Sequence, residues 1–288
     1  MSPPLTLRHE LQLYRLRIVI HGPASVLSPL RSLLLVAPDW LCSQPETETT
    51  TFVVHLAASP ESYHEVSRDG AHVWATRQLH DVVAYLESAI NSALAEHLRD
   101  YIQLHAGVVA LQNRGILIPA ASGSGKTTLV AGLVAAGARY LSDEAAVIDP
   151  ATGRLLPFAK SLYVRAGALD VLTKTFPELA ARSPFHQPNG DATWYLPPRP
   201  EWLPREPVAI RSIVLPTYRP GARSAMKPLP RSIALQRLLD QSFNLRAHRA
   251  QGIGRLVSFL QEIDCYQLTY SNLDDAIALI GAQVLGER

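Results

Sequence analysis

Alternating apolar and polar positions predict several β-strands in the first hundred residues. In LYRLRIVIHGP, Leu16, Ile18 and Ile20 fall on one face and Arg15 and Arg17 on the other, which is typical of a half-buried strand ending at a Gly-Pro turn. TFVVHLAAS and HVWAT have the composition of two further strands. From Leu79 to Leu98 the apolar residues recur at helical spacing. These elements predict a small α/β domain over residues 1–98.

A different pattern follows from residue 99. LHAGVVALQ and RGILIPA predict two buried strands, and TTLVAGLVAAG predicts a helix closed by Gly137. RYLSDEAAVID is strand-like until Pro150, whereas the proline-rich residues 182–207 predict a loop. The remaining patterns predict a buried strand, two amphipathic helices, a short strand and a closing helix, in VAIRSIVLPTY, SIALQRLLDQSF, GRLVSFLQEI, YQLTY and LDDAIALIGAQVL. We therefore expect a second α/β domain over residues 99–288.

Composition narrows the class of protein. The 288 residues are 47% hydrophobic, which is enough for a sizeable buried core, and the length favours two domains or one large domain. A net charge of +2 is too small to indicate a nucleic-acid or membrane surface, so we expect neither partner. Cys42 and Cys265 have no metal-ligand spacing and are too few for a disulfide framework. Because no signal-like or membrane-spanning apolar run is present either, we expect a cytoplasmic protein.

The segment ILIPAASGSGKTTL ends like the phosphate-binding loop G-x-x-x-x-G-K-[ST], with Ala120 in place of the first glycine. Glycines let backbone N–H groups converge on phosphate oxygens, and the following helix adds positive charge at its N-terminus. Lys126 would reach the terminal phosphates and Thr127 would bind Mg²⁺. The alternative is a structural glycine turn. We expect nucleotide contacts from Ser122, Gly123, Ser124, Gly125, Lys126, Thr127 and Thr128.

Three further residues are candidates for the chemistry. Asp143 and Glu144 follow an apolar segment, where the Mg²⁺-organising carboxylate of such proteins usually lies, whereas the later strand SIVLPTY ends without a carboxylate. The alternative for this pair is a solvated turn between two strands. His105 lies on an apolar strand before the loop, where a histidine is more often a core or edge residue than a catalytic one.

Together these segments resemble the catalytic core of the HPr kinase/phosphorylase family, particularly its stand-alone HPr-kinase-related members. The similar segments are LHAGVV with His105, ASGSGKTTL, the helix ending AAG, and YLSDEAAVID, within Leu104–Arg165. The resemblance implies a P-loop kinase domain of the HPr-kinase and phosphoenolpyruvate-carboxykinase type, preceded by the smaller α/β domain. It also implies an ATP- and Mg²⁺-dependent kinase that phosphorylates a serine hydroxyl.

The resemblance also implies residue roles. Asp143 matches the aspartate that accepts the substrate hydroxyl proton, and Glu144 stands where the family usually has a second aspartate. Thr127, Asp143 and Glu144 would be the metal ligands, and Asp143, His105 and Lys126 the catalytic residues.

Lys160 and Arg165 both lie where related proteins carry a basic residue, and the resemblance does not choose between them. We expect Arg165 among the ATP contacts. The arginine-containing motif of the regulatory enzymes has no clear match here, so neither phosphorylase activity nor HPr as substrate is implied.

The resemblance suggests a peptide or small protein as substrate, since some related kinases accompany peptide biosynthetic clusters and phosphorylate a precursor serine. Two other functions remain open, a non-catalytic nucleotide-binding sensor and a small-molecule phosphotransferase. Residues 1–98 contain no catalytic constellation, so we expect them to recognise a partner or to assemble a homo-oligomer.

Overall fold

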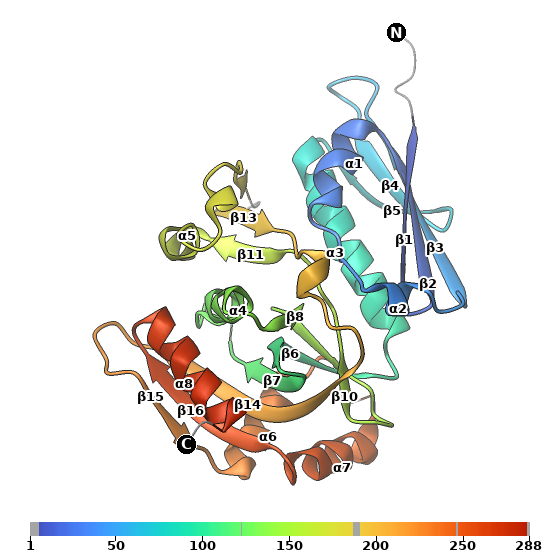
Figure 1. Ribbon diagram of the computed structural model, residues 1–288. Helices are drawn as coiled ribbons and strands as arrows, with labels where there is room; N and C mark the ends of the chain where they lie inside the picture. Colours follow the sequence, from blue (N-terminus) through green and yellow to red (C-terminus); the bar gives the residue numbers. More distant parts are fainter. Residues whose placement is uncertain (1–5, 122, 187–190, 246, 287–288) are drawn as a thin grey trace. The chain divides into compact units, whose positions relative to one another are not determined.

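The computed structural model describes residues 6–121, 123–186, 191–245 and 247–286 (Figure 1). The chain divides into two compact units with a boundary between Leu98 and Arg99, and His186 and Asp191 also group with the first unit. Both units combine sheets and helices, so the expected mixed α/β class is confirmed. Of the helices in the described ranges, none has both the length and the apolar character that crossing a membrane requires.

The first unit contains a five-stranded sheet in the order β1-β2-β3-β4-β5, in which only β2 and β3 pair in parallel. Helices α1 and α3 contact each other and the sheet. The elements are β1 (Leu7–Leu13), β2 (Leu16–Gly22), α1 (Ala24–Arg31), α2 (Asp39–Cys42), β3 (Glu48–His55), β4 (His64–Arg68), β5 (Ala71–Thr76) and α3 (Leu79–His97).

The apolar face of α3 explains how this unit is held together. Val82, Leu86, Ile90 and Leu94 recur at helical spacing and are all buried, as the sequence pattern predicts. The prediction of one strand through LYRLRIVIHGP was wrong at its start. Tyr14 and Arg15 have φ of 51° and 71°, so they form the turn of a hairpin between β1 and β2.

The second unit contains an eight-stranded sheet in the order β10-β9-β6-β7-β14-β16-β15, with β8 also paired to β6. β7, β14 and β16 are mutually parallel, whereas β6 is antiparallel to β7. The elements are β6 (Ile102–Leu111), β7 (Arg114–Pro119), α4 (Lys126–Ala135), β8 (Arg139–Ser142), β9 (Ala145–Ile148), β10 (Arg154–Leu156), β14 (Val208–Tyr218), β15 (Ala225–Pro228), α6 (Arg231–Asp240), α7 (Arg249–Leu260), β16 (Asp264–Tyr270) and α8 (Leu273–Leu285).

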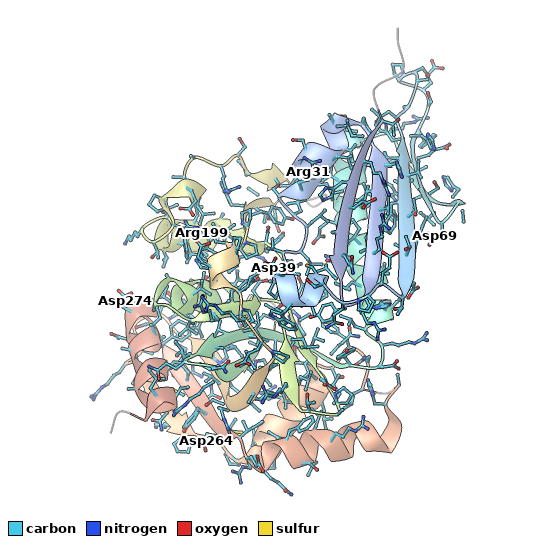
Figure 2. All side chains as sticks on the ribbon, turned by 45° about the vertical axis from the view of Figure 1, so that its right-hand side comes forward. Arg31, Asp39, Asp69, Arg199, Asp264 and Asp274 are labelled. Atoms are coloured by element: carbon cyan, nitrogen blue, oxygen red, sulfur yellow. The ribbon has the colours of Figure 1, made fainter. Side chains whose placement is uncertain are left out.

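Helices cover both faces of this sheet (Figure 1). The helices α6 and α7 pack their apolar residues against the face that carries Ala106 and Val108 of β6. Helix α4 lies on the opposite face and packs against α8. The helix α8 begins where the side chain of Asn272 accepts hydrogen bonds from the N–H groups of Asp274 and Asp275; Asp274 is labelled in Figure 2.

The proline-rich segment was only partly predicted. The expected loop over residues 182–207 contains two strands and a short helix, because Thr193–Leu196 pair with β11 and the prolines lie outside that pairing. The elements of this region are β11 (Leu162–Arg165), α5 (Ala166–Leu172), η1 (Pro177–Leu179), β12 (Phe185–His186), β13 (Ala192–Leu196) and η2 (Pro200–Trp202). The three strands form a separate sheet in the order β11-β13-β12.

The close packing of α4 on β6 can be tested at Gly107. A Cβ atom there would lie 2.6 Å from Cγ2 of Val130, a branched side chain on a buried helix face. Gly107→Ala should lower the free energy of unfolding by about 1–3 kcal/mol, as overpacking does. Gly281→Ala, in α8 with open space around it, should instead stabilise by about 0.5–1 kcal/mol. Urea unfolding followed by circular dichroism measures both, and equal stability of Gly107→Ala and the parent would contradict the packing.

Candidate functional site

The alternation of β6 places His105 and Gly107 on the face that α4 covers. Neighbouring side chains such as Val108 point to the opposite face, into the core with α6 and α7. At Gly107 an added Cβ would also lie 3.2 Å from Cγ of Lys126. The missing side chain therefore lets the stem of Lys126 lie directly against the strand, beside His105.

The glycine-rich loop joins β7 to α4, as the sequence predicts. Gly123 and Gly125 have φ of 82° and 86°, which side chains rarely adopt, and Gly125 is the residue before the helix. Within the described residues no side chain caps the N-terminus of α4. The hydroxyl oxygen of Ser124 is buried and finds no partner there. This loop therefore presents unsatisfied polar groups at a helix N-terminus, where an anion would satisfy them.

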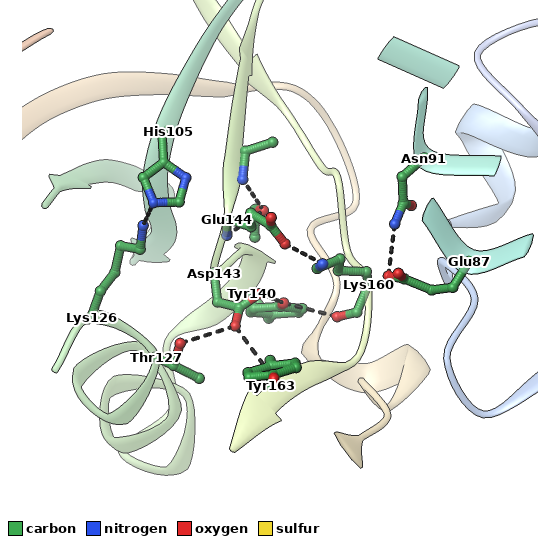
Figure 3. A network of polar contacts seen from close by, with 12 residues as sticks. Glu87, Asn91, His105, Lys126, Thr127, Tyr140, Asp143, Glu144, Lys160 and Tyr163 are labelled. Carbon is green, nitrogen blue, oxygen red and sulfur yellow. Dashed lines mark hydrogen bonds and ion pairs between the residues drawn. The ribbon is translucent and has the colours of Figure 1, made fainter. Parts of the chain in front are cut away.

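Lys126 is buried, with 7% of its surface exposed. Its ammonium Nζ lies 2.7 Å from Nε2 of His105 and 3.3 Å from the carbonyl oxygen of Ala120, as Figure 3 shows for the histidine. Both acceptors are neutral groups. Because burial disfavours the charged form more than the nearby carboxylates favour it, the pKa of Lys126 falls to about 8.

His105 is neutral near pH 7 in this setting. Burial and then the charge of Lys126 lower the pKa of the imidazole. A lysine ammonium can only donate, so Nε2 accepts and the ring proton lies on Nδ1. The imidazole also packs edge to face with the exposed ring of Phe243, with the ring centres 5.8 Å apart.

The acidic pair lies in a turn between two strands. The strand-like run RYLSDEAAVID is divided into β8 and β9, because the hydroxyl of Ser142 accepts hydrogen bonds from the N–H groups of Glu144 and Ala145. The prediction of one strand-like run is therefore wrong at Asp143 and Glu144. The alternative of a turn holds, but not as a solvated turn for Asp143, of which 3% is exposed.

Asp143 is surrounded by neutral donors (Figure 3). Its Oδ2 accepts from the hydroxyl of Thr127 at 3.2 Å and from the N–H of Tyr163 at 3.4 Å, and its Oδ1 accepts from the hydroxyl of Tyr140 at 3.2 Å. Burial raises the pKa of Asp143, the charge of Glu144 adds to the rise, and Lys160 opposes it. The contact with Thr127 brings the loop and the acidic turn together.

Of the two cations that the sequence leaves open, Lys160 joins the acidic pair. Its ammonium forms an ion pair with Glu144. Burial alone would raise the pKa of Glu144, but the charge and the hydrogen bond of Lys160 outweigh it, so this pKa is lowered. Arg165 is exposed before α5, with its guanidinium 5.9 Å from the ring centre of Tyr163.

The remaining predicted contacts are Ser122 and Thr128. Thr128 lies in the first turn of α4, next to Thr127. Ser122 lies outside the described residues. The sequence did not single out Tyr140, Tyr163 or Phe243. Their contacts depend on the pairing of distant segments, and no local motif marks them.

The donor set fits one Mg²⁺ ion. Oγ1 of Thr127 and Oδ2 of Asp143 are 3.2 Å apart, and two neighbouring ligands of an octahedral Mg²⁺ lie about 2.9 Å apart. Such sites usually use one or two carboxylates and complete the shell with phosphate and water. In the described part of the chain, no group of three or more His, Cys, Asp or Glu side chains forms a further candidate site.

Comparison with known proteins identifies no family. No protein-family model matches the chain, and a search of curated proteins finds no match. The functional interpretation therefore depends on the residues described above.

The buried amine of Lys126 should make stability depend on pH. The unfolded chain binds this proton with the ordinary pKa of 10.5, the folded chain with about 8, so the group costs stability below about pH 8 and the cost disappears as pH rises to 10.5. Lys126→Met should therefore be more stable than the parent near neutral pH, with an advantage that shrinks at about pH 10. Urea unfolding at both pH values measures it.

The exposed Lys174 supplies the control for this measurement. Lys174→Met should change stability little at either pH. A stability difference for Lys126→Met that stays the same at both pH values would contradict the assignment of the cost to the buried charge.

Proposed function

We propose that residues 99–288 form a P-loop kinase domain of the HPr-kinase type that uses ATP and Mg²⁺ to phosphorylate a serine hydroxyl of a peptide or small protein. The observation that carries the proposal is the contact of Thr127 with Asp143, beside the buried Lys126. It joins the glycine loop to the acidic turn, as phosphoryl transfer requires. Two free cysteines fit a cytoplasmic location.

The loop side of the site is suited to the phosphates. Lys126 is a buried cation whose hydrogen bonds go to neutral acceptors, so a phosphate would supply the missing opposite charge. The N–H groups at the start of α4 and the hydroxyl of Ser124 would add neutral donors. Bound Mg²⁺ would neutralise phosphate charge. Thr127 and the acidic turn are the residues that would hold it.

Asp143 is assigned as the proton acceptor. If Thr127 and Oδ2 of Asp143 held the metal, Oδ1 of Asp143 would remain to accept the proton. The position of Asp143 beside Thr127 supports this role, because a general base must lie within hydrogen-bond reach of the proton that it accepts. Glu144, which is more exposed, is assigned to the metal or its water molecules.

His105 and Lys160 complete the proposed transfer site. The neutral His105 holds Lys126 in place when no phosphate is present. Lys160 adds a cation on the acidic side, and its ion pair with Glu144 fixes both side chains. The serine acceptor comes from the resemblance to the HPr-kinase-related proteins. The first unit is proposed to recognise the acceptor or to assemble a homo-oligomer.

Asp143→Asn tests the proposal, because it keeps the shape of the side chain and removes the base. The variant should bind Mg·ATP nearly as the parent does but form phosphoserine about a hundredfold more slowly. Binding is measured by calorimetry, and transfer by mass spectrometry of a random serine-peptide library incubated with Mg·ATP. Lys126→Ala is the matched control and should lose most of the Mg·ATP affinity.

Each contrary result identifies a different error. If the parent does not bind Mg·ATP, the nucleotide site is wrong. If it binds Mg·ATP but phosphorylates neither the peptide library nor a panel of small hydroxyl compounds, the protein is a sensor. Transfer to the small compounds alone indicates a small-molecule phosphotransferase. If Asp143→Asn is as active as the parent and His105→Ala is inactive, the histidine accepts the proton.

A further inference from the structure

Two tyrosines end strands on the side of the glycine loop away from the acidic turn. β7 leads into the loop and lies between β6 and β14. His105 comes from β6, and the acidic turn joins β8 and β9, which also pair with β6. On the other side, β14 and β16 run parallel to β7, so their carboxyl ends reach the edge where the loop begins (Figure 1). Those ends are Tyr218 and Tyr270, which pair directly in the sheet.

Both tyrosines lie against Gly125. A Cβ atom on this glycine would lie 2.8 Å from the hydroxyl oxygen of Tyr270 and 4.0 Å from Cβ of Tyr218. The two rings pack edge to face with their centres 5.6 Å apart. Tyr270 is 3% exposed and supports the loop from within, whereas Tyr218 is 53% exposed. The exposed ring of Tyr218 therefore lies at the end of the glycine loop that adjoins α4.

The order of groups along a nucleotide indicates which part of it the ring of Tyr218 would contact. The transferred phosphate must lie between Lys126 and the acidic turn, on the β6 side of the loop. Base, ribose and phosphates follow one another in a chain, so the base extends away from that side. We propose that the nucleotide base stacks on Tyr218, at the ends of β14 and β16. This inference rests on the proposed function and adds the direction in which the nucleotide binds.

Stacking also predicts which nucleotides bind. Stacking on an aromatic ring contributes affinity without recognising the hydrogen-bonding groups of the base, because every base has a π surface. A purine overlaps a tyrosine ring more than a pyrimidine does. Tyr218 should therefore favour purine over pyrimidine triphosphates, and should discriminate little between ATP and GTP.

Calorimetry with two ligands separates the base from the phosphates. Mg·ATP contains both, and Mg·tripolyphosphate contains only the phosphate chain. Tyr218→Ala should bind Mg·ATP about tenfold more weakly than the parent, in the range of one lost base stack, and bind Mg·tripolyphosphate equally well. Tyr218→Phe keeps the ring and should bind both ligands like the parent. Phe243→Ala removes an exposed ring beside His105, on the opposite side of the loop, and should leave Mg·ATP affinity unchanged.

The outcomes distinguish this inference from the proposed function. A parent that binds neither ligand overturns both. If the parent binds both ligands but Tyr218→Ala loses neither, or loses both equally, the base does not stack on Tyr218 although the phosphate site stands. A loss of Mg·ATP affinity in Phe243→Ala and not in Tyr218→Ala would mean that the nucleotide lies in the reverse direction. Because Mg·tripolyphosphate binding requires a folded loop, it also shows that each variant is folded.

Discussion

The burial of one lysine is the constraint on which the candidate site depends. Lys126 lies at the start of α4 with its stem against β6, and its ammonium is held by the imidazole of His105 and a loop carbonyl. Neither acceptor carries a negative charge, so the fold keeps a cation in a place that disfavours it. A chain selected for stability alone would place an apolar residue here. The presence of Lys126 at this position is explained if the site binds an anion, which would pair with the ammonium.

The surrounding structure follows from the position of this side chain. Gly107 makes room for the stem, and the alternation of β6 turns His105 to the same face. Two glycines in left-handed conformations turn the chain from β7 into α4. The turn after β8 then brings Asp143 to Thr127. Sheet order thus separates two sides of the loop, one with the titratable groups and one with the tyrosines.

Local patterns predicted much of this arrangement. The strand, glycine loop and helix around Lys126 were predicted because turn glycines and apolar periodicity are local signals. The position of Asp143 in a turn between two strands was only the alternative that the sequence left open. Its burial was not predicted, because burial depends on Tyr140 and on the segment after β10, which are brought together only by the fold. For the same reason the sequence did not choose between Lys160 and Arg165, and only the fold shows that Lys160 pairs with Glu144.

The strands β1, β13 and β15 were missed for a related reason. Each is short or weakly patterned and is stabilised by pairing with another strand, so the local sequence carries little of the signal. Tyr218 is similar. Its sequence context is the end of an apolar strand, and only the register with Tyr270 and the approach to Gly125 place it beside the loop.

A crystal structure of the protein with Mg²⁺ and a non-hydrolysable ATP analogue tests the central claim most directly. The account predicts phosphate oxygens within hydrogen-bond distance of Nζ of Lys126 and of the N–H groups at the start of α4. It also predicts that the ammonium moves from its 2.7 Å contact with His105 toward the phosphates. An analogue bound elsewhere, with Lys126 still held by His105 and no phosphate at the loop, would contradict the account.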